Sequence, residues 1–326
     1  MISGIINIRK EKGFTSHDVV AKLRGILRQK KIGHTGTLDP DAEGVLPVCL
    51  GKATRLCDRI GDWDKTYEAV LLLGKTTDTE DISGTVLTER PVTVSEEEVR
   101  EIILSFVGGY DQIPPMYSAK KVGGRKLYEL AREGVVIERK ACPVRLYDIV
   151  IREIALPYVT FSVRCSKGTY IRSLCRDIGE KAGCGGCMAA LTRTNVAFFA
   201  IEDALTLAEV EALRDADALL EHILPVDSVF AGYPAVTVTE KAEKRLYNGN
   251  PVPWEACRSR SDEENVPAKP GADNLKSAGA GTDGAKAEES GAAMYRVYDR
   301  QGHFIGIYKR KNGAALLHPD KLFFDM

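Results

Sequence analysis

The 326-residue sequence has no apolar run near the roughly 18 residues that a membrane-spanning helix requires. Residues 1–13, MISGIINIRKEKG, also lack the apolar stretch of a signal peptide. We therefore expect a cytoplasmic protein that does not contact a membrane.

The sequence also lacks a complete metal-binding or disulfide pattern. Its eight cysteines are scattered along a long chain, unlike those of small disulfide-bonded secreted domains. Cys184 and Cys187 have the spacing of half a zinc site, but no second CxxC and no pair of histidines completes it. We expect reduced thiols and no bound metal.

The chain has almost no net charge, with a formal value of -1, but its charges are unevenly distributed. Residues 1–60 hold eleven Lys and Arg against six Asp and Glu, and residues 120–176 hold thirteen against five. Two basic regions on a neutral protein indicate a polyanionic partner bound over part of the surface, although solvated protein faces can have the same composition.

The stretch from Lys31 to Arg55, KIGHTGTLDPDAEGVLPVCLGKATR, contains neither of the phosphate-loop spacings GxxxxGK[ST] and GxGxxG. Its glycines and prolines break it too often for one helix, and its first half is too polar for a buried strand. We expect a loop in which Pro40 fixes the direction of the Asp39 carboxylate. A simple solvent-facing turn at Asp39-Pro40 is the alternative from the residues alone.

Within this stretch, GHTGTLDPDAEGVLPVCLGKATR resembles the catalytic motif of the TruB family of tRNA pseudouridine synthases. The resemblance covers nearly the whole chain and is most specific over residues 31–55, 112–128 and 165–172. It implies an α+β pseudouridine synthase fold, with a mixed, mostly antiparallel β-sheet flanked by helices and a small C-terminal PUA-like β-barrel. The implied domains are a catalytic domain, 1–228, and a PUA-like RNA-binding domain, 229–326.

Local patterns predict several elements of that fold. Alternating and β-branched residues predict strands over 4–10, 66–73, 143–154, 158–165 and 188–199. Helix-start signals occur at Thr15-Ser16 and at Ser95, where Glu98 completes a capping box. Residues 258–292 have no aromatic residue and few large aliphatic ones, so we expect a disordered insertion within the small domain.

Residues 112–134 form a basic segment with two prolines and a Gly-Gly pair. Their composition predicts a mobile loop that leads into a short helix, and a solvated insertion is the simplest explanation. The resemblance implies instead a thumb-like loop that grips an RNA stem-loop. Its candidate contacts to the RNA backbone are Lys120, Lys121, Arg125 and Lys126.

The resemblance assigns the chemistry to Asp39, Tyr67 and Arg172. An ionised carboxylate can attack or stabilise an electron-poor anomeric carbon, as in retaining glycosidases. Arg172 would orient Asp39 and lower its carboxyl pKa, and Tyr67 would relay the proton from C5 of the base. Attack at the ribose, attack on the base and a glycal route all use the same aspartate. Without the resemblance, Tyr67 is a core aromatic and Arg172 a surface cation.

A uridine must leave its base stack to expose its glycosidic bond, which costs a few kcal/mol. The resemblance implies that His34 fills the vacated space, that Tyr67 and Tyr170 stack on the flipped base, and that Leu191 contacts the uracil. The plain alternatives are a loop histidine at position 34 and a core leucine at position 191.

The implied activity is isomerisation of uridine to pseudouridine at uridine 55 in the T-loop of tRNA. We expect a monomer that needs no cofactor and no obligate protein partner and that recognises the T-arm stem-loop. Two alternatives are a guide-RNA-dependent pseudouridine synthase of a ribonucleoprotein and a tRNA-folding chaperone with incidental catalysis.

Overall fold

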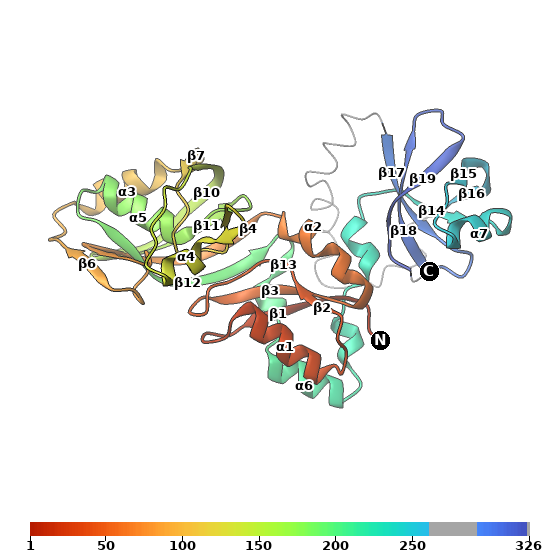
Figure 1. The fold of residues 1–326 in the computed structure, drawn as a ribbon, viewed down its shortest axis with the longest axis horizontal. Helices are drawn as coiled ribbons and strands as arrows, with labels where there is room; N and C mark the ends of the chain where they lie inside the picture. Colours follow the sequence, from red (N-terminus) through yellow and green to blue (C-terminus); the bar gives the residue numbers. More distant parts are fainter. Residues whose placement is uncertain (261–291, 325–326) are drawn as a thin grey trace.

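The computed structural model describes residues 1–260 and 292–324, which build two main β-sheets (Figure 1). The larger has nine strands in the order β1-β3-β12-β4-β11-β10-β7, with β2 paired to β3 and β13 paired to β12. Its strands are β1 (Gly4–Lys10), β2 (Ile32–His34), β3 (Glu43–Leu50), β4 (Lys65–Leu73), β7 (Gly108–Gln112), β10 (Cys142–Ala155), β11 (Tyr158–Cys165), β12 (Gly186–Val196) and β13 (Phe199–Ala200). Its β12–β3 pair is parallel and its other pairs are antiparallel, which confirms the expected mixed sheet.

Helices lie over both halves of this sheet. In Figure 1, α1 (Ser16–Ile26) and α6 (Leu207–Asp215) lie beside β1 and β2, and α3 (Glu96–Leu104) and α5 (Ile171–Lys181) lie beside β10 and β11. The side chains of Thr15 and Ser95 each accept a hydrogen bond from the backbone N–H three residues later, as the capping-box pattern predicts. The apolar stripes of these helices complete the cores on the sheet.

The second half of the expected loop over residues 31–55 is a strand, which corrects the prediction. β3 is buried over residues 44–50 despite Pro47. The β2–β3 pairing ends at Val48, so Pro47 lies just beyond that ladder, where its missing N–H breaks no β2–β3 hydrogen bond. The chain then forms a 3₁₀ helix, η1 (Gly51–Leu56), and α2 (Cys57–Gly61). The true loop is restricted to residues 35–42.

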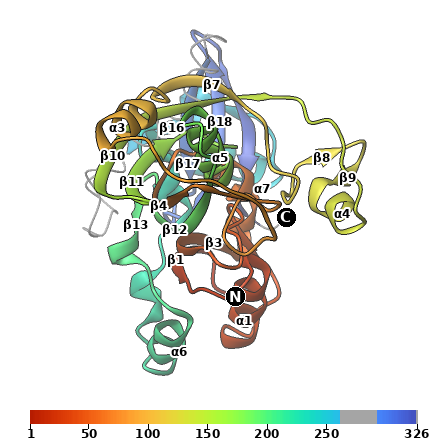
Figure 2. The same cartoon turned by 90° about the vertical axis from the view of Figure 1, so that its left-hand side faces the viewer.

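Two small hairpins extend from the larger sheet. β5 (Lys75–Thr77) pairs with β6 (Val86–Glu89), and β8 (Lys121–Val122) pairs with β9 (Arg125–Lys126), which leads into α4 (Leu127–Arg132). Figure 2 shows β8, β9 and α4 standing away from the sheet. The second hairpin and α4 have their own small cluster of buried apolar residues, Met116, Leu127 and Leu130. The expected basic loop is therefore a structured unit.

The six-stranded sheet is C-terminal and has the order β15-β19-β18-β17-β14-β16. Its strands, with one helix, are β14 (Ala235–Val238), α7 (Glu240–Tyr247), β15 (Val252–Pro253), β16 (Cys257–Arg260), β17 (Ala292–Tyr298), β18 (Phe304–Lys311) and β19 (Leu316–Leu322). The sheet curls into a half-barrel, in agreement with the small PUA-like β-barrel that the resemblance implies. The expected insertion 258–292 begins inside β16 and ends at the start of β17, and the rest of it lies outside the described residues.

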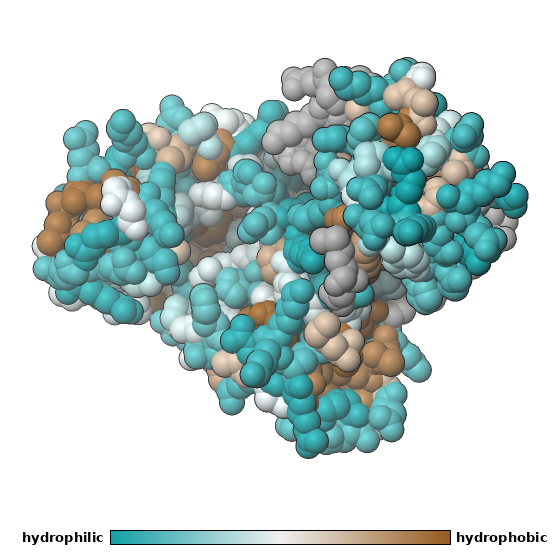
Figure 3. All heavy atoms as spheres, turned by 45° about the vertical axis from the view of Figure 1, so that its right-hand side comes forward, coloured by the Kyte–Doolittle hydropathy of each residue, from teal (hydrophilic) through white to brown (hydrophobic). Residues whose placement is uncertain are grey.

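One apolar cluster, here called the shared cluster, joins the two sheets. It includes Ile5 and Val45 from the larger sheet, Ile307 from the smaller sheet and Phe323, which directly follows β19. Phe230, in a 3₁₀ turn between them, has its ring centroid 5.8 Å from that of Phe323. Figure 3 shows that the outer surface on one side is mostly hydrophilic, as expected when the apolar side chains are used inside and between the sheets.

Candidate active site

The Asp39 loop, residues 35–42, is held in place by apolar side chains at both ends. Leu38 and Ala42 are buried in the main core of the larger sheet, so the chain between them must bulge toward the surface. The hydroxyl of Ser16, in α1, accepts a hydrogen bond from the Leu38 N–H at 3.0 Å. The Gly13 N–H donates to the Pro40 carbonyl at 2.9 Å. Asp39 therefore lies on a preorganised loop.

Lys10, at the end of β1, lies beneath this loop and is fully buried. Its ammonium donates to the carbonyls of Glu11 and Pro40, each at 3.1 Å, and to that of Ala42. Burial lowers the pKa of Lys10 to about 8, and the charge of Asp39 opposes this shift. Sequence reasoning did not assign Lys10 to the site, because a charged residue at a strand end carries no local sign of burial.

Asp39 and Arg172 form the ion pair that the resemblance implies. Arg172 Nε lies 3.0 Å from Asp39 Oδ2, and Nη2 lies 3.3 Å from Oδ1. The Arg172 side chain is 7% exposed, whereas that of Asp39 is 39% exposed and can reach a bound molecule. A two-point pair of this kind fixes both the position and the plane of the carboxylate.

Three further groups hold Arg172 in this orientation. Its guanidinium donates to the carbonyls of Tyr117 at 2.7 Å and of Thr79 at 3.1 Å. Asp81 lies 3.6 Å from Nη1. Arg172 thus connects the Asp39 loop to the β5–β6 turn and to the segment that precedes the β8–β9 hairpin.

Burial raises the pKa of Asp39 above its ordinary value, while the positive charge of Arg172 opposes the rise. Nearby Asp81 raises it further. We expected Arg172 to bring the pKa below the usual range. Its effect has that sign, but burial outweighs it.

Tyr67 is buried in the same core, on β4 directly opposite Arg193 of β12. Burial raises the pKa of its phenol, and the positive charge of Arg193 opposes that rise. A buried phenol with a raised pKa stays protonated near neutral pH, so it can donate a proton or pass one on.

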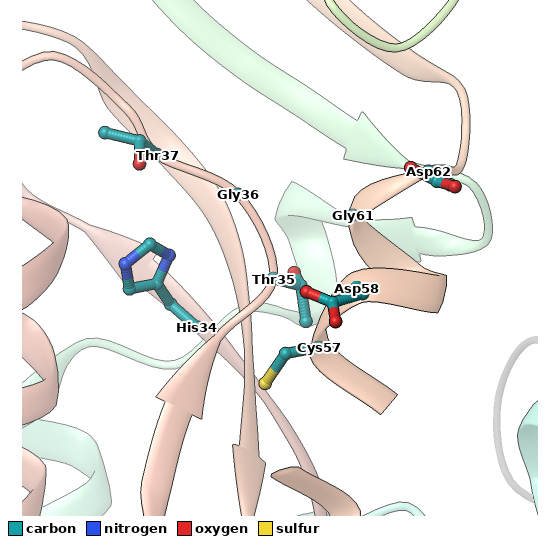
Figure 4. A pocket seen from close by; sticks show the side chains of 8 residues that line it. All are labelled: His34, Thr35, Gly36, Thr37, Cys57, Asp58, Gly61 and Asp62. Atoms are coloured by element: carbon teal, nitrogen blue, oxygen red, sulfur yellow. The ribbon is translucent and has the colours of Figure 1, made fainter. Parts of the chain in front are cut away.

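His34, at the end of β2, lines an open hollow of about 320 Å³ together with the next three residues and α2. Figure 4 shows residues 34–37 along one side, α2 along the other, and the His34 ring turned away from α2. The ring meets that of His17 edge-on at 5.1 Å. Burial lowers its pKa to about 4, so the imidazole is neutral at physiological pH. Its buried Nδ1 has no hydrogen-bond partner among the described residues.

Tyr170 and Leu191 occupy different settings. Tyr170 is the N-cap of α5, two residues before Arg172. Its backbone N–H donates to Gln112 Oε1 at 2.8 Å, and Gln112 Nε2 donates to its carbonyl at 3.0 Å. Within residues 1–260 and 292–324, no ring contact joins Tyr170 to Tyr67. Leu191 is 9% exposed and packs in the main core. Stacking of Tyr170 and uracil contact by Leu191 stay predictions.

The four candidate RNA-contacting cations, Lys120 just before the β8–β9 hairpin and three residues within it, have different contacts. Lys120 contacts the Cys142 thiol, and Arg125 pairs with Glu133. Lys121 is exposed on β8, and the Lys126 ammonium lies over the ring of Tyr128 at 5.3 Å. The hairpin that carries these cations follows Tyr117, whose carbonyl accepts a hydrogen bond from Arg172.

Sequence reasoning assigned no role to the acidic residues of the turn between β5 and β6. Glu80 is buried with a φ of 64°, accepts from Ser173 at 2.7 Å and pairs with Arg176. Three acidic residues within DTED, residues 78–81, shortly after the strand expected over 66–73, were a signal of this turn. No cluster of three or more His, Cys, Asp or Glu in the part of the chain that the structure describes could hold a metal ion, and no helix there could span a bilayer.

Comparison with known proteins identifies the class. Residues 24–171 match the family model described as the TruB family pseudouridylate synthase N-terminal domain, and residues 172–231 match the tRNA pseudouridylate synthase B C-terminal domain. The fold is that of the pseudouridylate synthases.

The chain is 50% identical to tRNA pseudouridine synthase B of Lachnoclostridium phytofermentans, covering 99% of this chain and 100% of that protein. It is 43% identical to the protein of that name from Clostridium kluyveri, covering 95% and 96%. The chain belongs to the TruB family.

Solved structures confirm the architecture. A Cbf5 chain in a crystal structure of a Cbf5-Nop10-Gar1 complex aligns with a TM-score of 0.67 at 24% identity, over 99% of this chain and 85% of that one. A chain of an H/ACA RNP bound to a substrate RNA containing 2'-deoxyuridine aligns with a TM-score of 0.66 at 23% identity. At this identity the likeness shows the fold.

Proposed function

We propose that this protein converts uridine to pseudouridine in tRNA, with Asp39 as the essential carboxylate. The observation that carries the proposal is the two-point contact between Asp39 and buried Arg172 on a loop fixed by Lys10 and Ser16. Preorganised charge at the reacting centre needs no rearrangement during the reaction, which is a major source of catalysis.

In this reaction, the uridine is flipped from its stack and its ribose C1' faces Asp39. The C–N glycosidic bond breaks, the uracil turns within the pocket, and C5 bonds to C1'. C5 then loses its proton, which Tyr67 relays, and N1, released from the ribose, takes up a proton, so no proton is gained or lost overall. The uracil is both leaving group and incoming group, so the reaction consumes no external reactant.

The substrate we propose is the T-arm stem-loop of tRNA, with uridine 55 as the target. The exposed basic hairpin, residues 121–126, supports this because cations on a projecting unit suit the phosphates of a folded RNA. We divide the chain into a catalytic domain, 1–228, and an RNA-binding domain, 229–326. His34, Tyr170 and Leu191 surround the flipped base, and the enzyme acts as a monomer.

The test is incubation of the purified protein with an unmodified T-arm stem-loop, followed by mapping of pseudouridine. We expect conversion by the wild type without a guide RNA or a second protein, and none by Asp39→Asn, which keeps the side-chain shape but removes the charge. Conversion only with an added guide RNA would support a ribonucleoprotein enzyme. Equal conversion by Asp39→Asn would refute the role of the carboxylate.

A further inference from the structure

Arg193, on β12, is a buried cation to which neither the sequence patterns nor the resemblance assigns a role. Its side chain is 1% exposed. Nε donates to the Val45 carbonyl at 2.7 Å, and Nη2 donates to the Gly36 carbonyl at 3.2 Å. Gly36 precedes Asp39 and Val45 follows it, so one guanidinium bridges the two ends of the segment that carries the carboxylate.

The backbone of Arg193 contacts the same segment. A Cβ atom placed on Gly44 would lie 2.2 Å from the Arg193 carbonyl oxygen. The backbones of β3 and β12 are therefore too close at this point for any side chain at position 44. Thr192 and Arg193 pair in parallel with Glu43 and Gly44, which joins β12 to β3 at the end of the Asp39 loop. On the other side of β12, Arg193 lies opposite Tyr67 in the antiparallel pairing of β12 with β4.

Stability alone does not account for an arginine at this position. Among residues 1–260 and 292–324, no carboxylate lies within 4.0 Å of its guanidinium, and the carbonyls of Val45 and Gly36 that accept from it are neutral. A buried cation without a paired anion is unfavourable for folding. An apolar side chain of the same volume would avoid that penalty, although it would leave the two carbonyls without their donor.

The charge of Arg193 also reaches two residues of β4, Tyr67 and Lys65. It opposes the rise in the pKa of Tyr67 that burial causes. After burial, it is the largest influence on the pKa of Lys65, which is lowered to about 8. Arg193 is therefore placed to act both on the loop that carries Asp39 and on the phenol of Tyr67.

We propose that Arg193 is a positioning residue for the isomerisation: its fork holds the Asp39 loop closed against β12 and aligns the carboxylate with Tyr67. This inference rests on the proposed function. Lysine keeps the charge but has a compact ammonium that cannot reproduce the fork, whereas methionine keeps much of the volume and removes the charge.

The experiment compares Arg193→Lys and Arg193→Met with the wild type in single-turnover conversion of T-arm RNA, with RNA affinity measured separately. A shift of about 1 Å in a reacting group can cost on the order of 100-fold in rate, and we expect this loss for Arg193→Met. For Arg193→Lys, which is expected to fold even if Arg193→Met does not, we expect a loss of about tenfold. The RNA dissociation constant should stay within about threefold of the wild-type value, since Arg193 is buried away from solvent.

The matched control is Arg296→Lys. Arg296 is 4% exposed on β17 of the other sheet, and its Nε also donates to a carbonyl, that of Tyr233, at 2.8 Å. We expect this variant to lose thermal stability like Arg193→Lys while keeping its conversion rate. Equal rates for Arg193→Lys and the wild type, or equal losses in both lysine variants, would overturn the inference. Absence of conversion by the wild type would instead overturn the proposed function.

Discussion

Replacement of Arg172 by lysine tests the link between the Asp39 geometry and the reaction. The guanidinium makes two contacts to Asp39, at 3.0 and 3.3 Å, and two to backbone carbonyls, at 2.7 and 3.1 Å. A lysine ammonium is a single point and cannot contact both carboxylate oxygens and both carbonyls in their present positions. The substitution therefore removes two charge-assisted hydrogen bonds.

The size of the effect follows from the energy of those bonds. Hydrogen bonds to charged groups contribute about 1.5–3 kcal/mol, and the lower end applies because Asp39 is 39% exposed. Two such bonds amount to about 3 kcal/mol if they act fully on the transition state. That difference lowers the rate about 100-fold.

The assay measures tritium released from C5-labelled uridine in a T-arm stem-loop under single-turnover conditions, together with RNA affinity. We expect Arg172→Lys to lose about 100-fold in rate with nearly unchanged affinity. A rate within about fivefold of wild type would show that orientation of Asp39 by Arg172 does not limit the reaction. A loss confined to affinity would show that Arg172 acts in RNA binding instead.

Three further predictions concern the loop, the hairpin and pH. Gly44→Ala should destabilise the protein in thermal unfolding by at least about 1–3 kcal/mol, because Gly44 has a φ of 109° and no space for a Cβ. Combined replacement of Lys121 and Lys126 by alanine should make the plot of log RNA affinity against log salt concentration less steep. The slope should fall by about 0.7–0.9 for each phosphate that the variant no longer neutralises. An unchanged slope would exclude a role of these lysines in phosphate binding. Because the pKa of Asp39 is raised and the carboxylate is the reactive form, the rate should fall with decreasing pH at a midpoint above the ordinary aspartate value. Arg172→Met should move that midpoint further up, since Arg172 opposes the rise, and a downward shift in the pH–rate profile would contradict this reasoning.

Features with a local physical cause were predictable from the sequence. The capping boxes at Thr15 and Ser95 begin α1 and α3, because the residues that satisfy the first free N–H groups lie within three positions. Residues of β4 and β11 alternate between the core and the surface over much of their length. The contact between Asp39 and Arg172, which are 133 residues apart, came only from the family resemblance.

Features created by distant partners were not predictable. Pro47 suggested an irregular loop, but β1 and β12 complete a sheet around β3 and bury it. Lys10 and Arg193 are buried because they donate hydrogen bonds to carbonyls of the Asp39 loop. That loop is distant from both residues in sequence, so no neighbouring residue indicates their burial. A lone basic residue in a strand looks the same in sequence whether it faces solvent or a buried turn.

The shared cluster also affects how a substrate can be selected. Moving the six-stranded sheet away from the larger one would expose Phe230 and Phe323 to water, and fully burying one such side chain contributes about 1.5–3 kcal/mol. The span between the outlying half-barrel and the Asp39 carboxylate is therefore nearly constant. If RNA binds both parts, as we propose, an RNA whose folded shape matches this span binds without separating the two sheets, so overall RNA shape would contribute to which molecules react.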